Sequence, residues 1–485
     1  MSKYETLQPK SVWQIFAELS RVPRGSGNET AVIDMLKAWA DARGLKWRDD
    51  AVGNLLVEIP GSKGRERAAP VLVQGHVDMV CEKNSGTKHD FGTDPIKLVV
   101  KGGWVEADGT TLGADNGIGV AMGLAVALEK GLKHPPLEIL LTVDEERGLT
   151  GAAGVRAGFF KSRRMINLDS EEDAALFVGC AGGRDSDIVV KNKKVKLGKG
   201  LVGRRVSVKG LKGGHSGLDI HKHRGNAIKI LTRVLLAAHG EVPFKLVDID
   251  GGSMRNAIPR EAEARVAVPE GEARRFKKLV DAAAARIKSE ELAGTDEGLV
   301  VKVGGARVAH SLGGNCTLRT LHLLDALPNG VLGMSTAIAG LVESSSNVGV
   351  VKTDGAQVRI ICCSRSSNMS ELDGLVARHR SVVALLGDRA AIAQPEGYPG
   401  WQPNPRSTLV RTTAGMYKRL FKTEPVLTAI HAGLECGLLT EKYPGLDIVS
   451  FGPDITGAHS PDERVSIESV GKIWKLFTAV LADLD

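Results

Sequence analysis

The chain has 485 residues, of which 42% are hydrophobic, 25% charged and 4% aromatic, and its formal net charge is +7. This length is sufficient for two or more domains. Few aromatic residues and mostly interspersed charges argue against nucleic acid as a partner. No apolar run is long enough to cross a membrane, so we expect no membrane partner either.

Two further features concern the compartment. Residues 1–16 lack the basic-then-apolar pattern of a secretory signal, so we expect a cytoplasmic protein. The cysteines show no CxxC spacing, which predicts reduced, mostly buried thiols rather than disulfides or a thiolate zinc site. The stretch 191–210 is basic and contains no acid; we expect a solvated face, with attraction of an anionic substrate as the alternative.

The first part of the chain alternates strands with helices. Residues 29–43 carry apolar residues at helical spacing, with Asn28 placed to cap the start and Gly44 to end it. The segment 117–129 is apolar nearly all round and predicts a buried helix. Strand-like runs lie at 54–59, 70–75, 137–143 and 165–168. This alternation predicts an α/β domain with a mixed, mostly parallel sheet.

The pattern changes after about Gly183. Alternating strands then mix with helices, which is typical of an α+β domain with a more antiparallel sheet. The Pro/Gly-rich stretch 393–405 reads as a linker, and the first pattern resumes beyond it. We therefore expect a discontinuous first domain, 1–183 and 399–485, with 184–398 as an inserted domain.

Acidic and histidine residues stand at or just past the ends of five apolar runs. They are His76, Asp78, Asp115, Glu145, Glu146, Asp169 and His459. The carboxyl ends of strands are where open α/β sheets hold their ligands. Imidazole and carboxylate ligands suit zinc, cobalt or manganese. The joint pattern indicates a two-metal hydrolase.

Each part of this pattern also has a plainer explanation. His76 and Asp78 lie on one side of a strand, so Asp78 can orient the imidazole, but His-x-Asp is also a common chance pair. Asp115 could bridge two metals or could only cap a helix. Adjacent Glu145 and Glu146 repel unless a cation or proton offsets the charge, which fits one as ligand and one as general base, although DEERG could be a solvated turn. Asp169 could be a turn or capping residue, and His459 a surface or packing histidine. It is improbable that all these alternatives hold at once.

The chain resembles the M20 family of metallopeptidases over essentially its whole length. The strings that carry the resemblance include QGHVDMVCEKN, DGTTLGADNGIG, LTVDEERGLTGA, INLDSEE, GLKGGHSGLDIHKHRGNA, GGSMRNAIPR, YPGWQPNP, HAGLECG and GPDITGAHSPDE. Within the family they are most similar to the aminoacyl-histidine (Xaa-His) dipeptidase branch. The resemblance implies that His76 and Asp169 hold one metal, Glu146 and His459 hold the other, and Asp115 bridges them.

The resemblance also implies roles for further residues. Glu145 is the general base or acid, Asp78 orients His76, and His215 of the GGHSG motif donates to the developing oxyanion. The inserted domain resembles the family's lid, which also serves dimerisation. Substrate contacts are implied for Asn256, Arg365 and Gly433, and Arg365 suits the C-terminal carboxylate of a dipeptide.

The expected activity is metal-dependent hydrolysis of dipeptides, Xaa-His (carnosine-like) substrates among them. We expect two divalent ions, zinc first, with cobalt or manganese as alternatives, and a homodimer. Two other functions remain open at this point. One is a different M20 activity, such as deacylation of N-acyl amino acids or cleavage of tripeptides. The other is a non-catalytic peptide-binding protein, against which the intact ligand set argues.

Overall fold

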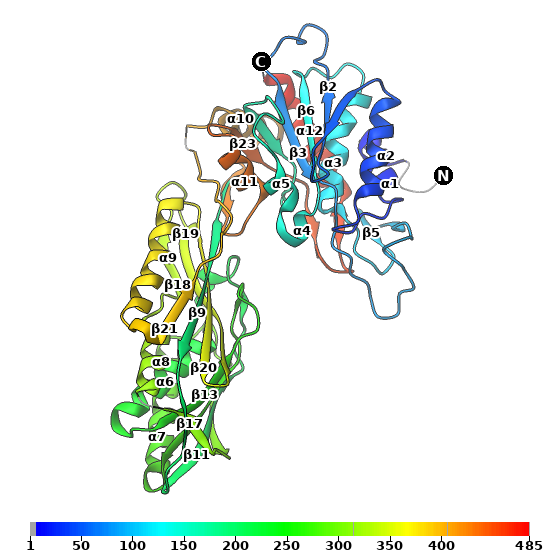
Figure 1. Cartoon of the computed structure of the whole chain (residues 1–485). Helices are drawn as coiled ribbons and strands as arrows, with labels where there is room; N and C mark the ends of the chain where they lie inside the picture. The colour runs from blue at the N-terminus through cyan, green and yellow to red at the C-terminus, as the bar shows by residue number, and fades with distance from the viewer. Residues whose placement is uncertain (1–5, 314, 405, 485) are drawn as a thin grey trace. The chain divides into compact units, whose positions relative to one another are not determined.

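The computed structural model describes residues 6–313, 315–404 and 406–484, and the chain divides into two compact units (Figure 1). The first unit comprises Met1–Gly179, Pro403–Ala429 and Leu434–Asp485, and the second comprises Cys180–Gln402 and Ile430–Gly433. The boundaries expected from the sequence, after residues 183 and 398, differ from these by a few residues. The first unit is therefore assembled from three separate stretches of chain.

The first unit is built around an eight-stranded mixed sheet. Its order is β1 (Lys46–Asp49), β2 (Leu55–Ile59), β6 (Leu137–Thr142), β3 (Val71–His76), β7 (Arg164–Asn167), β23 (Asp447–Ser450), β8 (Ala175–Cys180) and β22 (Val426–Ile430). The central strands β6, β3, β7 and β23 run parallel, and antiparallel pairs flank them. Every residue of β3 and β6 is buried, as expected of parallel strands covered on both faces. The predicted α/β class is confirmed.

Helices cover this sheet, and α1, α2 and α3 lie together beside it in Figure 1. The helices of the unit are α1 (Lys10–Leu19), α2 (Thr30–Asp41), α3 (Ala114–Ala125), α4 (Glu145–Gly148), α5 (Thr150–Gly154), α10 (Thr408–Phe421), α11 (Glu435–Lys442) and α12 (Ile467–Asp483). Helix α3 is the buried helix predicted at 117–129; it begins earlier and passes into a 3-10 turn, Val126–Leu128. It lies so close to the strand ends that a Cβ at Gly119 would collide with the carbonyl of Leu168. A small second sheet of this unit contains β4 (Leu98–Lys101), β5 (Trp104–Ala107), β24 (Ile455–Thr456) and β25 (Arg464–Ser466).

The helix predicted at 29–43 is α2, but its predicted cap is wrong. The residue before the helix is Glu29, and no side chain caps the helix start within the described chain. Glu29 Oε1 instead accepts hydrogen bonds from the backbone N–H of Gly27 (2.8 Å) and Asp144 (3.0 Å), so it fastens the turn before α2 to the loop after β6. Gly44 has a φ of +64° just past the helix, as expected of a residue that ends one.

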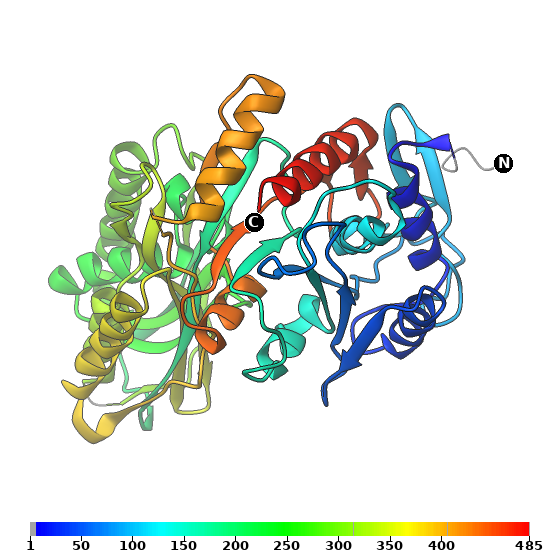
Figure 2. The same ribbon diagram turned by 90° about the horizontal axis from the view of Figure 1, so that it is seen from above.

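The second unit contains a larger, mainly antiparallel sheet with helices along one face (Figures 1 and 2). Its strands are β16 (Val300–Ala306), β11 (Leu201–Lys209), β15 (Ala262–Pro269), β13 (Lys245–Gly251), β19 (Val342–Asp354), β20 (Gln357–Ser366), β9 (Gly182–Lys191) and β21 (Ala390–Ala393), with β18 (Gly330–Met334) paired to β19. The helices are α6 (Ala227–Glu241), α7 (Ala273–Glu290), α8 (Cys316–Ala326) and α9 (Met369–Ala384). Short strands β10 (Lys194–Lys196) and β17 (His310–Leu312) pair with each other, as do β12 (Gly214–His215) and β14 (Ala257–Ile258). This unit has its own apolar core between α6, α7, α8 and the sheet.

The segment 393–405 contains the crossing from the second unit to the first, as expected of a linker, and part of it is paired to the second unit. Tyr398 forms a β-bridge with Gly183, and Trp401 forms one with Cys180. The segment is thereby fixed to the second unit until the chain returns to the first at Pro403. Residue 405 lies outside the described residues.

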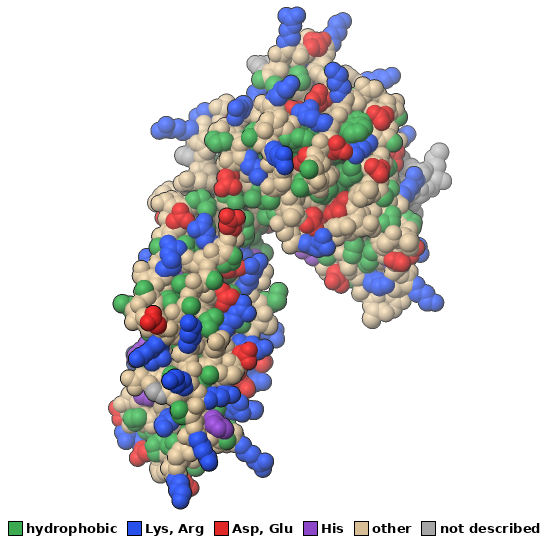
Figure 3. Space-filling model, in the orientation of Figure 1, with side chains coloured by type: hydrophobic (Ala, Val, Ile, Leu, Met, Phe, Trp, Pro, Cys, Tyr) green, Lys and Arg blue, Asp and Glu red, His purple; other side chains and the backbone are tan. Residues whose placement is uncertain are grey.

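Surface charge is mixed over the face shown in Figure 3, where acidic and basic side chains are interspersed. In the basic stretch 191–210, Arg205 lies 3.9 Å from Glu263 of the neighbouring strand β15, and Lys209 lies 3.4 Å from Glu261, just before that strand. No helix in the described part of the chain is long and apolar enough to span a membrane. All six cysteines are free thiols and five of them are buried, as predicted.

Candidate metal centre

Three neighbouring parallel strands bring most of the predicted ligands to one edge of the first sheet. His76 is the last residue of β3, and Asp169 lies two residues beyond β7. Glu145 and Glu146 open α4 directly after β6, where Asp144 adopts a left-handed φ of 53°. Because parallel strands end at the same edge, these side chains meet there.

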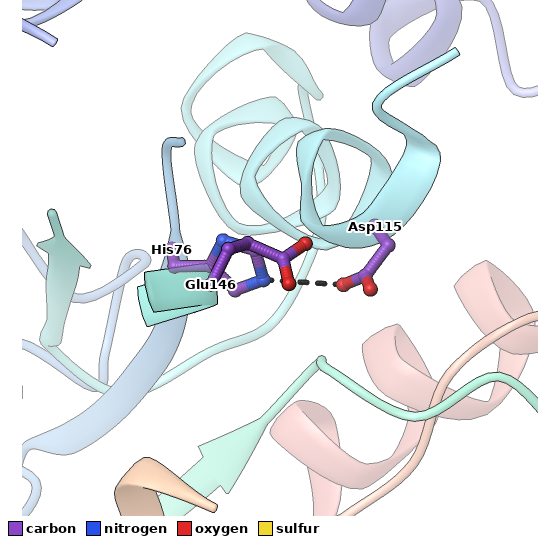
Figure 4. Close-up of side chains that lie close together, drawn as sticks. All are labelled: His76, Asp115 and Glu146. Carbon is purple, nitrogen blue, oxygen red and sulfur yellow. Dashed lines mark hydrogen bonds and ion pairs between the residues drawn. The ribbon is translucent and has the colours of Figure 1, made fainter. Parts of the chain in front are cut away.

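Asp115 lies between two histidines rather than capping α3. Its φ and ψ are not helical, and no side-chain cap bond forms at this helix start in the described chain. Its Oδ1 lies 3.1 Å from His76 Nε2, the contact drawn in Figure 4. Its Oδ2 lies 3.2 Å from His459 Nε2. One carboxylate therefore presents one oxygen to each imidazole, which is the arrangement needed to bridge two cations.

Each histidine also faces a carboxylate of its own. Asp169 Oδ1 is 3.3 Å from His76 Nε2, and Glu146 Oε2 is 2.9 Å from His459 Nε2. Ligand atoms of His76, Asp115 and Glu146 all lie within 4.8 Å of one another (Figure 4). The five side chains thus form two groups that share Asp115.

The donor set fits divalent metal ions. Its atoms are imidazole nitrogens and carboxylate oxygens, which zinc, cobalt and manganese all accept. Glu146 Oε1 is buried and has no hydrogen-bond partner among the described residues, as expected of an oxygen that needs a cation. The hydrogen bonds of Asp115 and Glu146 raise the pKa of His459 to about 11. Burial alone would lower the pKa of His76, yet Asp169 and the other carboxylates raise it well above its usual value. The cluster therefore attracts positive charge strongly.

Asp78 holds both His76 and the start of α4. Its Oδ1 lies 3.2 Å from His76 Nδ1, so the opposite ring nitrogen faces Asp115. Asp78 also accepts hydrogen bonds from the backbone N–H of Glu145 (3.1 Å) and Glu146 (3.2 Å) and from Ser26 Oγ (2.7 Å). Burial would raise the pKa of Asp78, but the hydrogen bond to His76 lowers it to about 2, so Asp78 stays ionised.

Burial raises the pKa of Glu145 well above its usual value, and Asp169 and Glu435 add to the shift.

Two buried charged residues that the sequence did not single out hold the Asp115 turn. Glu463 accepts hydrogen bonds from the backbone N–H groups of residues 112–115, at 2.8, 3.0, 2.7 and 3.3 Å. Arg24 donates to the carbonyls of Val77, Asp78 and Gly113. An anion is stabilised where several N–H groups of a helix start converge, so Glu463 fixes the turn from which Asp115 projects.

The remaining predicted residues belong to the second unit. His215 Nδ1 accepts hydrogen bonds from the backbone N–H of Gly217 and Leu218, both at 3.2 Å, which leaves the ring proton on Nε2. Burial, and then the charge of Arg365, lower the pKa of His215, so its ring is a neutral donor. Asn256 is half-buried, and its carbonyl accepts from Ser216 N–H at 2.8 Å.

Arg365 is a buried cation of the second unit, only 6% exposed. Its Nη1 donates to Tyr398 Oη at 2.7 Å, and none of the described carboxylates forms an ion pair with it. A buried guanidinium without an anionic partner is typical of an anion-binding site. A Cβ on Gly433 would lie 2.7 Å from the Tyr398 ring, so this position has room only for glycine. His431 lies nearby, and its pKa falls to about 3 through burial and then the charge of Arg365.

This fold and this donor set are those of a metal-dependent hydrolase. The model of peptidase family M20/M25/M40 matches residues 72–483, and the chain belongs to that family. The resemblance drawn from the sequence motifs is confirmed.

Relatives that match the whole chain include two with more than 40% identity. The cytosol non-specific dipeptidase of Escherichia coli K12 is 42% identical over 485 residues, 100% of this chain and 99% of that protein. The crystal structure of aminoacylhistidine dipeptidase from Vibrio alginolyticus superposes with a TM-score of 0.94 at 41% identity, covering 100% of this chain and 98% of that one. An acetylornithine deacetylase from Myxococcus xanthus is 31% identical over 252 residues, 47% of this chain and 58% of that protein.

Proposed function

We propose that this protein is a metal-dependent dipeptidase that hydrolyses the amide bond of dipeptides, Xaa-His dipeptides among them. The observation that carries the proposal is the position of Asp115, with one oxygen toward His76 and the other toward His459. Two divalent ions held by His76, Asp169, Asp115, Glu146 and His459 would polarise the scissile carbonyl and lower the pKa of the attacking water. Zinc is our first assignment, and cobalt or manganese would satisfy the same donors.

In this proposal Glu145 moves the protons. Its carboxylate accepts a proton from the attacking water and delivers it to the leaving amine. The backbone N–H of Glu145 donates to Asp78, which also contacts His76. Asp78 therefore positions both the proposed base and a proposed metal ligand. Such fixed positioning is what general acid–base catalysis requires.

The second unit is assigned the role of lid and dimerisation domain. His215 would donate its Nε2 proton to the developing oxyanion, since its Nδ1 is already occupied as an acceptor. Arg365 would bind the C-terminal carboxylate of the dipeptide, and Asn256 and Gly433 would contact the substrate backbone. The buried charge of Arg365, which forms an ion pair with none of the described carboxylates, supports this assignment.

Both full-length relatives are named for dipeptide cleavage, one as non-specific and one as acting on aminoacyl-histidine. We therefore propose a broad specificity that includes histidine at the second position. The name of the Escherichia coli relative also supports a cytosolic location. We further propose a homodimer, as the family resemblance implies, and light scattering on the purified protein would test it by the molar mass.

The choice of substrate separates the dipeptidase from a deacylase. The metal-loaded protein would be given alanyl-histidine, N-acetyl-histidine and N-acetyl-ornithine at equal concentrations, and the released amino acid or acetate measured. Cleavage of alanyl-histidine alone supports the proposal. Cleavage of the N-acetyl compounds alone would contradict it and favour the activity named for the partial relative.

A further inference from the structure

The three strands that carry the candidate metal centre also carry three buried polar side chains close to it, Gln74, Thr142 and Asn167. Gln74 of β3 and Asn167 of β7 are register partners, and Thr142 of β6 pairs with His76. Gln74 stands two residues before His76, so both point to the same side of β3. The three polar residues are 0–1% exposed, and every residue of β3 and β6 is buried.

Glu435, the first residue of α11, contacts two of these side chains. Its Oε2 accepts hydrogen bonds from Gln74 Nε2 (2.6 Å) and Thr142 Oγ1 (2.7 Å). Gln74 Oε1 in turn accepts from Asn167 Nδ2 at 2.6 Å. One carboxylate thus connects β3 and β6 directly, and β7 through Gln74.

The charge of Glu435 is poorly compensated by its own contacts. The side chain is 1% exposed, its Oε1 has no hydrogen-bond partner in the described chain, and none of the described Lys or Arg side chains forms an ion pair with it. Burying a carboxylate without a nearby positive charge is strongly unfavourable. Positive charge can be supplied from the ligand cluster, because Thr142, which donates to Glu435, is the register partner of His76. Burial raises the pKa of Glu435 to about 7, and the charge of His76 acts against this shift.

We propose that Glu435 is a positioning residue of the metal centre: it binds no metal, but it fixes Gln74 and Thr142 behind the ligands and adds a buried negative charge that strengthens cation binding. This inference rests on the proposed metal centre, but it does not depend on which substrate is cleaved. A different role, in which Glu435 only fastens α11 to the sheet, would stabilise the fold without affecting metal affinity.

Glu138 provides a matched control on the same strand. It is also buried, at 6% exposure, and its Oε2 accepts from the backbone N–H of Lys161 (2.9 Å) and Ser162 (2.8 Å). It precedes Thr142 by four residues, about 13 Å along a strand. Glu138→Gln therefore removes a buried carboxylate from the same sheet at a distance from the metal centre.

The test measures metal affinity of the full chain rather than turnover. Metal-free wild type, Glu435→Gln and Glu138→Gln would be titrated with zinc against a chromophoric chelator, and thermal unfolding of each metal-free protein recorded. We expect Glu435→Gln to bind zinc about 10- to 100-fold more weakly, the usual effect of losing an outer-shell partner, while Glu138→Gln stays within about threefold of wild type. Wild-type affinity in Glu435→Gln, or an equal loss in Glu138→Gln, would overturn the inference.

A second variant keeps the test decisive if Glu435→Gln does not fold. Thr142→Val removes one of the two hydrogen bonds to Glu435 with little change in volume, and we expect a smaller loss of zinc affinity, about three- to tenfold. Unchanged affinity in Thr142→Val would count against the inference. A wild type that binds zinc but cleaves no dipeptide would instead contradict the proposed function alone. A wild type that binds no zinc would overturn both.

Discussion

The carboxylate of Glu463 binds the backbone N–H of Asp115, at 3.3 Å, together with the three N–H groups before it. His459, four residues earlier in the chain, contacts the side chain of the same Asp115. The loop that carries His459 and Glu463 therefore contacts the loop that carries Asp115 in two ways, through the backbone N–H and through the side chain of Asp115. The position of Asp115, the proposed shared ligand, depends on residues almost 350 positions apart in sequence.

Glu463→Ala is expected to destabilise the protein strongly. It would leave four N–H groups without their acceptor and remove an anion from the surroundings of buried Arg24. The free energy of unfolding should fall by about 3–5 kcal/mol, as for other broken buried charge contacts. Urea denaturation in a chelator measures this, with Ala at the exposed neighbour Asp462 as the control. A loss below about 1 kcal/mol, the scale of one ordinary hydrogen bond, would show that Glu463 does not hold the turn.

Glu145→Gln should separate catalysis from metal binding. The variant keeps the backbone bond to Asp78 but cannot accept a proton, so kcat should fall about 10²- to 10⁴-fold. Metal content and the melting temperature should stay at wild-type values. Activity within about fivefold of wild type would transfer the role of general base to another group.

Arg365→Met should weaken recognition of the substrate carboxylate. A hydrogen bond to a charged group contributes about 1.5–3 kcal/mol, so kcat/KM for a dipeptide should fall about 10- to 100-fold. The same variant should show almost no loss on a dipeptide amide, which lacks the carboxylate. Equal losses on both substrates would mean that Arg365 does not bind that group.

The buried His379 predicts a dependence of stability on pH. Its side chain is fully buried on α9 beside Ser186 Oγ (2.9 Å), and burial, with a smaller effect of Arg378, lowers its pKa to about 4. In the unfolded chain its pKa is about 6.5, so below this pH the unfolded state binds a proton that the folded state does not. The contribution of His379 is therefore intact above about pH 6.5 and is lost as the pH falls toward 4, by up to about 1.4 kcal/mol per pH unit.

His379→Asn tests this directly. The variant should be less stable than wild type at neutral pH, and the difference should shrink as the solution is acidified from about pH 6.5 to 4. Thermal unfolding in a chelator, followed across this range, measures it. If the difference in stability between wild type and His379→Asn stayed constant from pH 6.5 to 4, His379 would not titrate as described.

Patterns within single strands were sufficient to predict much of the centre. His76, Asp169 and the Glu145–Glu146 pair stand at or just past the ends of strand-like apolar runs, which is why they were expected to meet at one sheet edge. The sequence could not decide between cap and bridge for Asp115, because both use a carboxylate before a helix. In the structure no side-chain cap bond forms at the start of α3 among the described residues, and the two carboxylate oxygens of Asp115 lie toward His76 and His459.

Residues whose partners lie far away in sequence escaped prediction. Glu463 looks like part of an exposed polar turn, since nothing near it indicates the four donors at residues 112–115. Gln74 and Asn167 did offer a signal, because each is a polar residue inside an apolar strand, which is costly unless paired. Their partner, Glu435, could not be inferred without the fold, because it is 361 residues from Gln74. Asn28 was a plausible cap, but the helix begins after Glu29, whose carboxylate accepts one local bond from Gly27 N–H and one tertiary bond from Asp144 N–H.

The central claim is that one bridging aspartate organises a two-metal centre that cleaves dipeptides. The most direct measurement adds zinc, cobalt or manganese stepwise to metal-stripped protein and follows histidine release from β-alanyl-histidine and alanyl-histidine together with bound metal. We predict that release appears with metal, reaches its plateau as two ions bind per chain, and is absent in Asp115→Ala, which should also lose metal. Full activity without metal, or wild-type metal content and turnover in Asp115→Ala, would contradict the account.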